Sequence, residues 1–219
     1  MAAVASVRLT NLARPLAVLI GATYLVEHAA LIVRGTWSLD DNLPLHLTDV
    51  VTIVSVLALW TATPRLVELT YFWALTASVQ AVLTPNLTES TATIFVFTFF
   101  ITHSGAIVAA ILLVAGCKII PPAGAIRRMF GATLVVAAAA AIGDLLTGGN
   151  YMFLREKPST ASLLDVMGPW PIYILTAAAL ALALFTLLDL PLRRARARRA
   201  GSGGPASAAA TSCGRRGSA

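Results

Sequence analysis

Three residues that can take part in proton transfer or nucleophilic attack lie close together in the segment LPLHLTDV, residues 43–50. His46, Thr48 and Asp49 stand at the start of a strongly apolar stretch. A titratable group inside an apolar membrane span costs at least about 2–3 kcal/mol on insertion scales, so such a group usually has a partner and a function. On a helix His46 and Asp49 are spaced i,i+3 and share one face, which predicts a polar stripe directed into the protein.

A second candidate for proton transfer is His103, in the apolar segment FFITHSG. A histidine beside a threonine hydroxyl is the arrangement in which a general base activates a weak nucleophile. If His103 reaches Thr48, the pair predicts acyl transfer or ester hydrolysis. The alternatives are that His103 is a neutral, hydrogen-bonded core residue and that Thr52 and Ser55 only join helices through hydrogen bonds.

The chain that must position these residues has 219 residues, of which 58% are hydrophobic and 12% are charged. Soluble domains carry about 25% charged residues. Apolar runs of about 18–25 residues recur, each long enough to cross a hydrocarbon core as a helix. The predicted fold class is therefore all-α, a polytopic membrane protein. The six predicted transmembrane helices are residues 15–33, 43–62, 66–83, 93–115, 129–146 and 171–192.

The basic residues predict how this bundle is oriented. With six helices, all 16 Lys and Arg residues except Arg34, Arg155 and Lys157 fall on the side of the two termini. The positive-inside rule therefore predicts that both termini are cytoplasmic. Residues 1–192 form the predicted transmembrane domain, and the basic, low-complexity residues 193–219 a disordered cytoplasmic tail that contacts anionic lipid. We expect a membrane-lipid partner and no nucleic acid.

The remaining polar residues gather in the half of the bilayer away from the termini, which predicts a polar cavity open to one face of the membrane. The residues expected to support this cavity are Glu27, His46, Asp49, Gln80 and Asp144. The connection 148–171 is expected to bind a substrate headgroup through Asn150, Tyr151, Arg155, Glu156 and Lys157. The alternatives are an ion pair between Glu27 and Arg34 and a loop whose charges are only solvated.

No metal site is expected, and no cofactor. The three histidines have no HxxxH or HExxH spacing, and the two cysteines have no CxxC spacing. These spacings are the ones typical of zinc sites.

Four segments resemble the YwaF family of bacterial integral membrane proteins, in the right order and over about residues 15–192. They are LPLHLTDV, LVELTYFWALTASVQAVLTPNL, FFITHSG, and GGNYMFLREKP followed by SLLDVMGPWPIYI. The resemblance implies a six-helix protein of the bacterial cell membrane. That family is distantly similar to animal multi-pass phospholipid acyltransferases, which implies a cysteine in the second helix and a histidine in a later one.

The residue after LPLHL departs from that pattern, because YwaF-like sequences typically have Cys there and this chain has Thr48. The departure weakens a cysteine mechanism, since a thiolate forms far more easily than an alkoxide. The ADTRP-type membrane hydrolases are similar more remotely and imply a threonine nucleophile paired with histidine. Carried over to this chain, Thr48 is the nucleophile and His103 the base.

Three functions remain open from the sequence. The first is an intramembrane acyltransferase or hydrolase acting on a phospholipid or lysolipid, with Asp49 or Glu27 orienting an imidazole and His46 or Gln80 stabilising the oxyanion. The second is a transporter or binding protein for a small polar or anionic solute, which would depend on Arg155 and Asp144. The third is a non-catalytic membrane protein whose polar cluster is structural. Neither the substrate nor the oligomeric state follows from the sequence.

Overall fold

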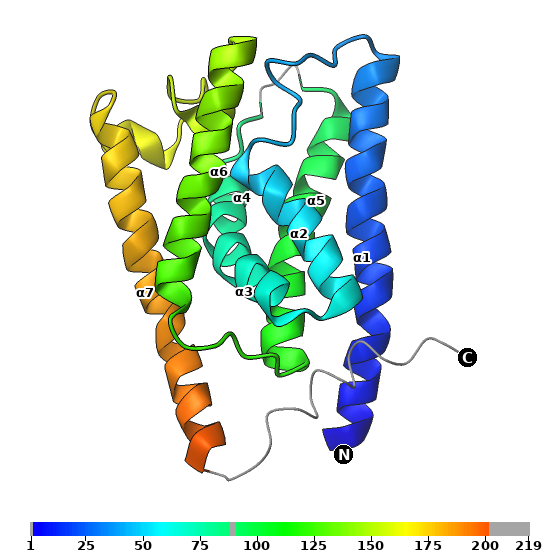
Figure 1. The fold of residues 1–219 in the computed structure, drawn as a ribbon. Helices are drawn as coiled ribbons and strands as arrows, with labels where there is room; N and C mark the ends of the chain where they lie inside the picture. Colours follow the sequence, from blue (N-terminus) through cyan, green and yellow to red (C-terminus); the bar gives the residue numbers. More distant parts are fainter. Residues whose placement is uncertain (1, 88–90, 202–219) are drawn as a thin grey trace.

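The computed structural model describes residues 2–87 and 91–201 of the chain. Within these ranges all regular structure is helical, and the helices stand side by side in one bundle (Figure 1). The α-helices are α1 (Ala2–Val33), α2 (Leu47–Thr61), α3 (Pro64–Trp73), α4 (Val79–Leu83), α5 (Thr93–Ile111), α6 (Ala125–Thr147) and α7 (Ile172–Gly201). The π-helical turns are η1 (Ala74–Ser78) and η2 (Leu112–Gly116), and the 3-10 turns are η3 (Tyr151–Phe153) and η4 (Leu163–Val166). The predicted all-α class is confirmed.

The number of full-length membrane spans differs from the prediction. In the described ranges, five helical segments are long and apolar enough to cross a membrane: Asn11–Val33, Pro64–Leu83, Thr93–Gly116, Ala125–Thr147 and Ile172–Gly201. Helix α2, which corresponds to the predicted transmembrane helix 43–62, has 15 residues. At 1.5 Å per residue it is about 22 Å long, less than the roughly 30 Å of a hydrocarbon core. The prediction of six transmembrane helices is therefore wrong, because the segment predicted as the span 43–62 forms a short apolar helix.

Helix α2 begins late because residues 34–46 form a connection that descends from the top of α1 into the bundle (Figure 1). Pro44 disfavours helical backbone in the residue before it. His46 has extended backbone angles at the N-cap of α2. Leu43 N–H donates a hydrogen bond to the Tyr151 hydroxyl, 3.0 Å away. Pro44 and the hydrogen bond from Leu43 to Tyr151 therefore make a loop of the residues that were expected to form the first turn of α2.

Small residues let the helices approach closely in the middle of the bundle. A Cβ added to Gly105 of α5 would lie 2.7 Å from Cγ1 of Ile20 on α1. Ala106, Ala109 and Ala110, which follow on α5, are fully buried. Close backbone approach at small residues is a main source of helix association in membranes. Gly105 and Ala106 therefore allow α5 to pack closely in the bundle.

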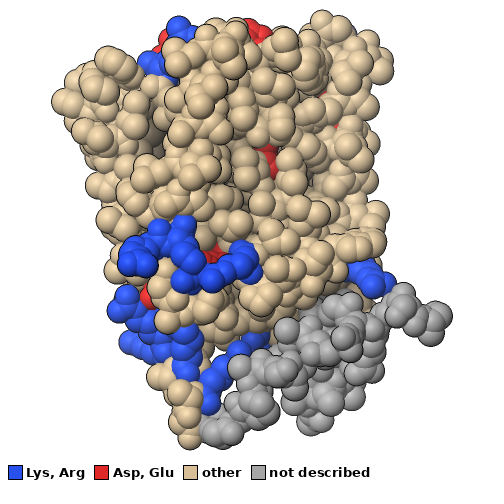
Figure 2. Space-filling view, viewed as in Figure 1, with Lys and Arg blue, Asp and Glu red and all other residues tan. Residues whose placement is uncertain are grey.

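The two ends of the bundle differ in charge. The N-terminal end of α1 and the C-terminal end of α7 lie at the same end, drawn at the bottom in Figure 1. Lys and Arg side chains gather at this lower end in Figure 2. Helix α7 runs to Gly201, nine residues past the predicted boundary at residue 192, so residues 193–201 are helical. Residues 202–219, the rest of the predicted tail, lie outside the described residues.

Candidate functional site

The connection 34–46 and the connection 148–171 contact each other at the end of the bundle opposite to the end where Lys and Arg gather. The backbone N–H of Met152 donates a hydrogen bond to Nδ1 of His46, 3.2 Å away. The ring of His46 also packs edge-on against Tyr151, with ring centroids 5.2 Å apart. Because Nδ1 accepts this hydrogen bond, the proton of the neutral ring is on Nε2. His46 therefore has an N–H to offer on the other side of its ring.

Tyr151 and Asp144 hold this contact in place. The Tyr151 hydroxyl donates to the carbonyl oxygen of Leu39 at 2.8 Å, and the Tyr151 N–H donates to Oδ1 of Asp144 at 2.6 Å. Tyr151 is fully buried and Asp144 is 2% exposed. A Cβ on Gly143 would lie 2.4 Å from Cδ1 of Leu45, so only glycine lets the 34–46 connection pack against α6 here.

The turn beside His46 has unusual backbone conformation. Met152 and Phe153 both have left-handed backbone angles, with φ of 55° and 56°. Two side chains secure them, because His46 accepts from Met152 N–H and the Tyr173 hydroxyl donates to the Phe153 carbonyl oxygen at 2.6 Å. Left-handed backbone in non-glycine residues costs of order 1–3 kcal/mol each and persists only where surrounding contacts enforce it.

Burial lowers the pKa of His46, which lies in the connection before α2, and the nearby carboxylates of Asp41 and Asp144 offset part of this effect. His46 therefore stays neutral at pH values at which an exposed histidine gains its proton. A neutral imidazole is the form that can accept the hydrogen bond from Met152.

The charged residues of the 148–171 connection mostly bind the connection itself. Nη1 of Arg155 donates to the carbonyl oxygens of Gly148 and Gly149 at 2.8 and 3.1 Å, which caps the C-terminus of α6. The Asn150 side chain accepts from the N–H groups of Arg155 and Glu156 and donates to the Glu156 carbonyl oxygen. Of the five residues expected to bind a headgroup, Asn150, Tyr151 and Arg155 therefore use their side chains in structural contacts. Glu156 makes such contacts through its backbone.

Lys157 completes that loop. Its Nζ lies 3.4 Å from the carbonyl oxygen of Asp165 and 5.6 Å from the ring centroid of Tyr173. The contact to Tyr173 has the geometry of a cation–π interaction.

A second pair of polar residues joins α1 and α2, two helices that pack together. The carboxylates of Glu27 on α1 and Asp49 on α2 are close enough to interact electrostatically. Tyr24, one turn before Glu27, interacts with both carboxylates, and its buried hydroxyl has no hydrogen-bond partner. Glu27 forms no ion pair within 4.0 Å in the described part of the chain, which excludes the expected alternative of a pair with Arg34 there.

The hydroxyl of Thr48 differs from those of most other helical threonines. Many of these donate to the carbonyl oxygen four residues earlier: Thr52, Thr61, Thr76, Thr84, Thr102, Thr133, Thr147, Thr176 and Thr186. Thr48 lies in the first turn of α2, where the residue four positions earlier is Pro44 in the preceding loop. Its Oγ1 makes no hydrogen bond within the described ranges, and the residue is half-buried.

His103 lies on α5, which packs against α2. Its ring stacks on Phe99 with centroids 4.1 Å apart, and Nδ1 lies 2.7 Å from the Phe99 carbonyl oxygen. A carbonyl oxygen only accepts, so Nδ1 carries the proton and Nε2 has the lone pair. Among the described residues no hydrogen bond reaches Nε2 of His103, and none joins this ring to Thr48.

Gln80 lies apart from these contacts. Its side-chain amide donates to Oγ1 of Thr84 one turn later at 2.7 Å. The structure therefore gives Gln80 a local partner, while His46 joins Asp144 and Tyr151, and Asp49 joins Glu27.

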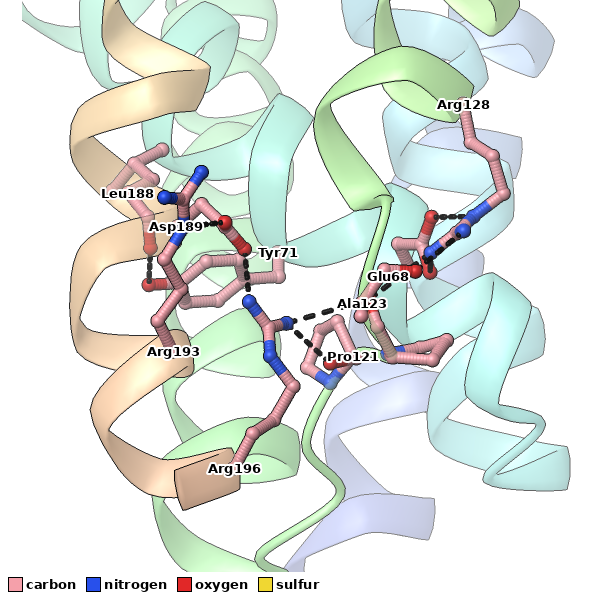
Figure 3. A network of polar contacts seen from close by, with 10 residues as sticks. Glu68, Tyr71, Pro121, Ala123, Arg128, Leu188, Asp189, Arg193 and Arg196 are labelled. Carbon is pink, nitrogen blue, oxygen red and sulfur yellow. Dashed lines mark hydrogen bonds and ion pairs between the residues drawn. The ribbon is translucent and has the colours of Figure 1, made fainter. Parts of the chain in front are cut away.

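An arginine–carboxylate network at the lower end was not expected to be part of any site (Figure 3). Glu68 of α3 is 2% exposed and accepts two hydrogen bonds from Arg128 of α6, at 2.8 and 3.0 Å. Asp189 of α7 is 3% exposed and accepts from Arg193 and Arg196, each at 2.6 Å. The spacing of Asp189 from Arg193, i,i+4 on one helix, is the sequence signal that could have revealed the second pair.

No group of three or more His, Cys, Asp or Glu side chains arranged to hold a metal ion occurs among the residues that the structure describes. Comparison with known proteins gives one match, a family model described as the TMEM164 family, over residues 3–189. No curated protein and no solved structure matches the sequence. The resemblances to the YwaF family and to the ADTRP-type hydrolases stay predictions. With most of its length matched and five membrane-spanning helical segments, the chain is a multi-pass membrane protein that belongs to the TMEM164 family.

Proposed function

We propose that this protein is an intramembrane lipid acyltransferase or ester hydrolase with Thr48 as nucleophile and His103 as general base. One observation carries the proposal. The Thr48 hydroxyl and Nε2 of His103 have no hydrogen-bond partner in the described part of the chain, and they lie on two helices that pack together, α2 and α5. A hydroxyl and an imidazole lone pair that are both free of hydrogen bonds are the groups that this chemistry needs.

The reaction would proceed in two halves. In the first, Oγ1 of Thr48 bonds to the acyl carbon of a phospholipid or lysolipid, its proton passes to Nε2 of His103, and the ester oxygen leaves with that proton. In the second, the oxygen of water or of an acceptor lipid bonds to the acyl carbon and gives its proton to Nε2 of His103. The bond between the acyl carbon and Oγ1 of Thr48 then breaks, and Oγ1 takes that proton back from His103. General-base contacts often close only in the substrate complex. The acyl ester would therefore lie between the two side chains.

The tautomers of the histidines suit different roles in this scheme. Nδ1 of His103 is protonated by its contact with Phe99, so Nε2 is a base. His46 has the opposite tautomer, because Nδ1 accepts from Met152, so its Nε2–H is a donor for the developing oxyanion.

Binding or transport of an anionic solute has less support. Arg155, the residue that this alternative requires, uses its guanidinium to cap α6.

The test is covalent labelling of the purified protein with a lipid-like fluorophosphonate. The test variants are Thr48→Val and His103→Ala. The matched controls are Thr52→Val, a threonine on the same helix as Thr48, and His28→Ala, a histidine on the spanning helix α1. We expect both test variants to lose at least about 100-fold in labelling rate, in line with the loss of a nucleophile or a general base, while both controls label like wild type. Labelling of Thr48→Val at the wild-type rate would contradict the proposal.

A further inference from the structure

A groove at the lower end of the bundle lies far from the Thr48 region. It has a volume of about 420 Å³ and runs between the end of α5 with η2 and the C-terminal part of α7. Ligand pockets commonly have volumes of about 300–1,000 Å³. Its lining combines apolar residues, such as Val114, Ile120 and Leu192, with three basic residues, Lys118, Arg198 and Arg199.

The groove has a large excess of positive charge. Lys118, Arg198 and Arg199 line it, and no acidic residue does. The two buried carboxylates nearby, Glu68 and Asp189, are already paired with other arginines, as Figure 3 shows. In the described part of the chain, Nζ of Lys118 and the guanidinium of Arg198 have no hydrogen-bond or ion-pair partner.

The backbone of Lys118 joins the two sides of the groove. Lys118 has a left-handed backbone with φ of 59° and lies two residues after the π-helical turn η2. Its carbonyl oxygen accepts a hydrogen bond from Nη2 of Arg199 on α7. This contact brings the Arg199 guanidinium of α7 to the backbone of Lys118, so basic residues from both sides of the groove meet here. Non-glycine residues in strained backbone are often found at binding sites.

The surroundings of the groove select the ligand. Most of its apolar residues belong to two membrane-spanning segments, Thr93–Gly116 and Ile172–Gly201, and its basic residues come from the lower ends of these segments, at the end of the bundle where Lys and Arg gather in Figure 2. A ligand that complements both parts has an anionic phosphate and a long hydrocarbon chain. We propose that this groove binds one anionic phospholipid, with its phosphate at Lys118, Arg198 and Arg199 and one acyl chain along the apolar residues.

The experiment is native mass spectrometry of the detergent-purified full chain with dioleoylphosphatidylglycerol, and with dioleoylphosphatidylcholine as the zwitterionic comparison. The test variant is Lys118→Gln/Arg198→Gln. The matched control is Arg127→Gln/Arg194→Gln, which removes the same charge from two exposed residues outside the groove. We expect one tightly bound phosphatidylglycerol on the wild type and the control, and binding about 10- to 30-fold weaker for the test variant.

Two further measurements separate the lipid from simpler explanations. Ala115→Trp fills the groove from an exposed position and should weaken phosphatidylglycerol binding as much as the charge variant does. Inorganic phosphate and glycerol 3-phosphate should not compete, because they lack the chain. Equal losses in the two double variants would show general surface attraction and overturn the proposal. Competition by phosphate alone, or unchanged binding in Ala115→Trp, would overturn it as well.

Discussion

At the scale of single residues, the direction of one hydrogen bond decides what each histidine can do. His103 donates from Nδ1 to a carbonyl oxygen within its own helix, while His46 accepts at Nδ1 from a loop more than 100 positions away in the sequence. The first arrangement leaves a base and the second leaves a donor. Sequence reasoning identified both residues as polar candidates, but it cannot assign the tautomer of His46, because the partner that determines it, Met152, is not a sequence neighbour.

His46 also predicts a pH dependence of stability. Burial lowers the pKa of His46 in the folded protein, while in the unfolded chain its pKa is about 6.5. Because the unfolded state then binds more protons, the free energy of unfolding should be highest above about pH 6.5 and should fall as the pH drops through that value. The measurement is the thermal midpoint in one detergent between pH 8 and pH 5.

The control for that titration is His46→Gln, whose amide oxygen can still accept the hydrogen bond from Met152. This variant should show a smaller fall in the midpoint between pH 7 and pH 5 than the wild type shows. An identical fall in both proteins would mean that His46 is not the group responsible.

At the scale of elements, contacts between helices depend on a few small residues. Gly105 brings α5 against Ile20 of α1, and Gly143 brings α6 against Leu45 of the 34–46 connection. The first contact has a signal in the sequence, since a glycine in an apolar run is a recognised packing signal. The sequence did not predict the second, because the partner of Gly143 is a loop that had been expected to be helical.

Gly105→Ala tests the packing of α5 on α1. The added methyl group would lie 2.7 Å from Cγ1 of Ile20, so we expect a destabilisation of about 1–3 kcal/mol. Gly131→Ala on α6, where nothing lies within 4 Å, should be neutral or stabilising by a few tenths of a kcal/mol. The readout is chemical unfolding in mixed micelles. Equal effects of the two substitutions would contradict close packing at Gly105.

Glu68→Gln tests the ion pair that joins α3 to α6. The glutamine keeps the size of the side chain but leaves Arg128 without its charged partner, and about a third of the Arg128 side chain is exposed to solvent. We therefore expect a moderate loss of about 2 kcal/mol. Glu156→Gln, in the exposed loop, should change stability by less than about 0.5 kcal/mol. If the thermal midpoints of Glu68→Gln and Glu156→Gln are equal, the ion pair between Glu68 and Arg128 has no structural role.

Most of the fold could be predicted from the sequence, because the length and apolarity of a span are local properties. The predicted ranges 66–83, 93–115 and 129–146 lie within the observed spans Pro64–Leu83, Thr93–Gly116 and Ala125–Thr147. The exceptions depend on contacts between distant segments. The Tyr151 hydroxyl binds Leu43 and Leu39 and so shortens α2, and Arg128 binds Glu68 across 60 residues. A local pattern carries neither signal.

At the scale of the whole molecule, the bundle has a basic end and, opposite to it, an end where polar loops meet (Figures 1 and 2). The positive-inside rule predicts that the basic end, with both termini, faces the cytoplasm. A fluorescent protein that folds only in the cytoplasm should therefore fluoresce when fused to the C-terminus, and a phosphatase active only outside the cell should be inactive there. The reverse pattern would contradict the predicted orientation.

This arrangement separates two roles for lipid. The proposed reaction at Thr48 uses the polar half of the bundle, and the proposed phospholipid groove between η2 and α7 uses the basic end. The two proposals stand on different residues, so the variants Thr48→Val and Lys118→Gln/Arg198→Gln should fail in different assays.

The most direct measurement is to locate the covalent bond. The wild-type protein, labelled with the lipid-like fluorophosphonate, would be digested and its modified peptide sequenced by tandem mass spectrometry. The account predicts that the adduct lies on Thr48, in the peptide that contains LPLHLTDV, and that His103→Ala lowers its yield without moving it. An adduct on another hydroxyl, such as that of Ser55 or Ser104, or no adduct on a folded protein, would contradict it.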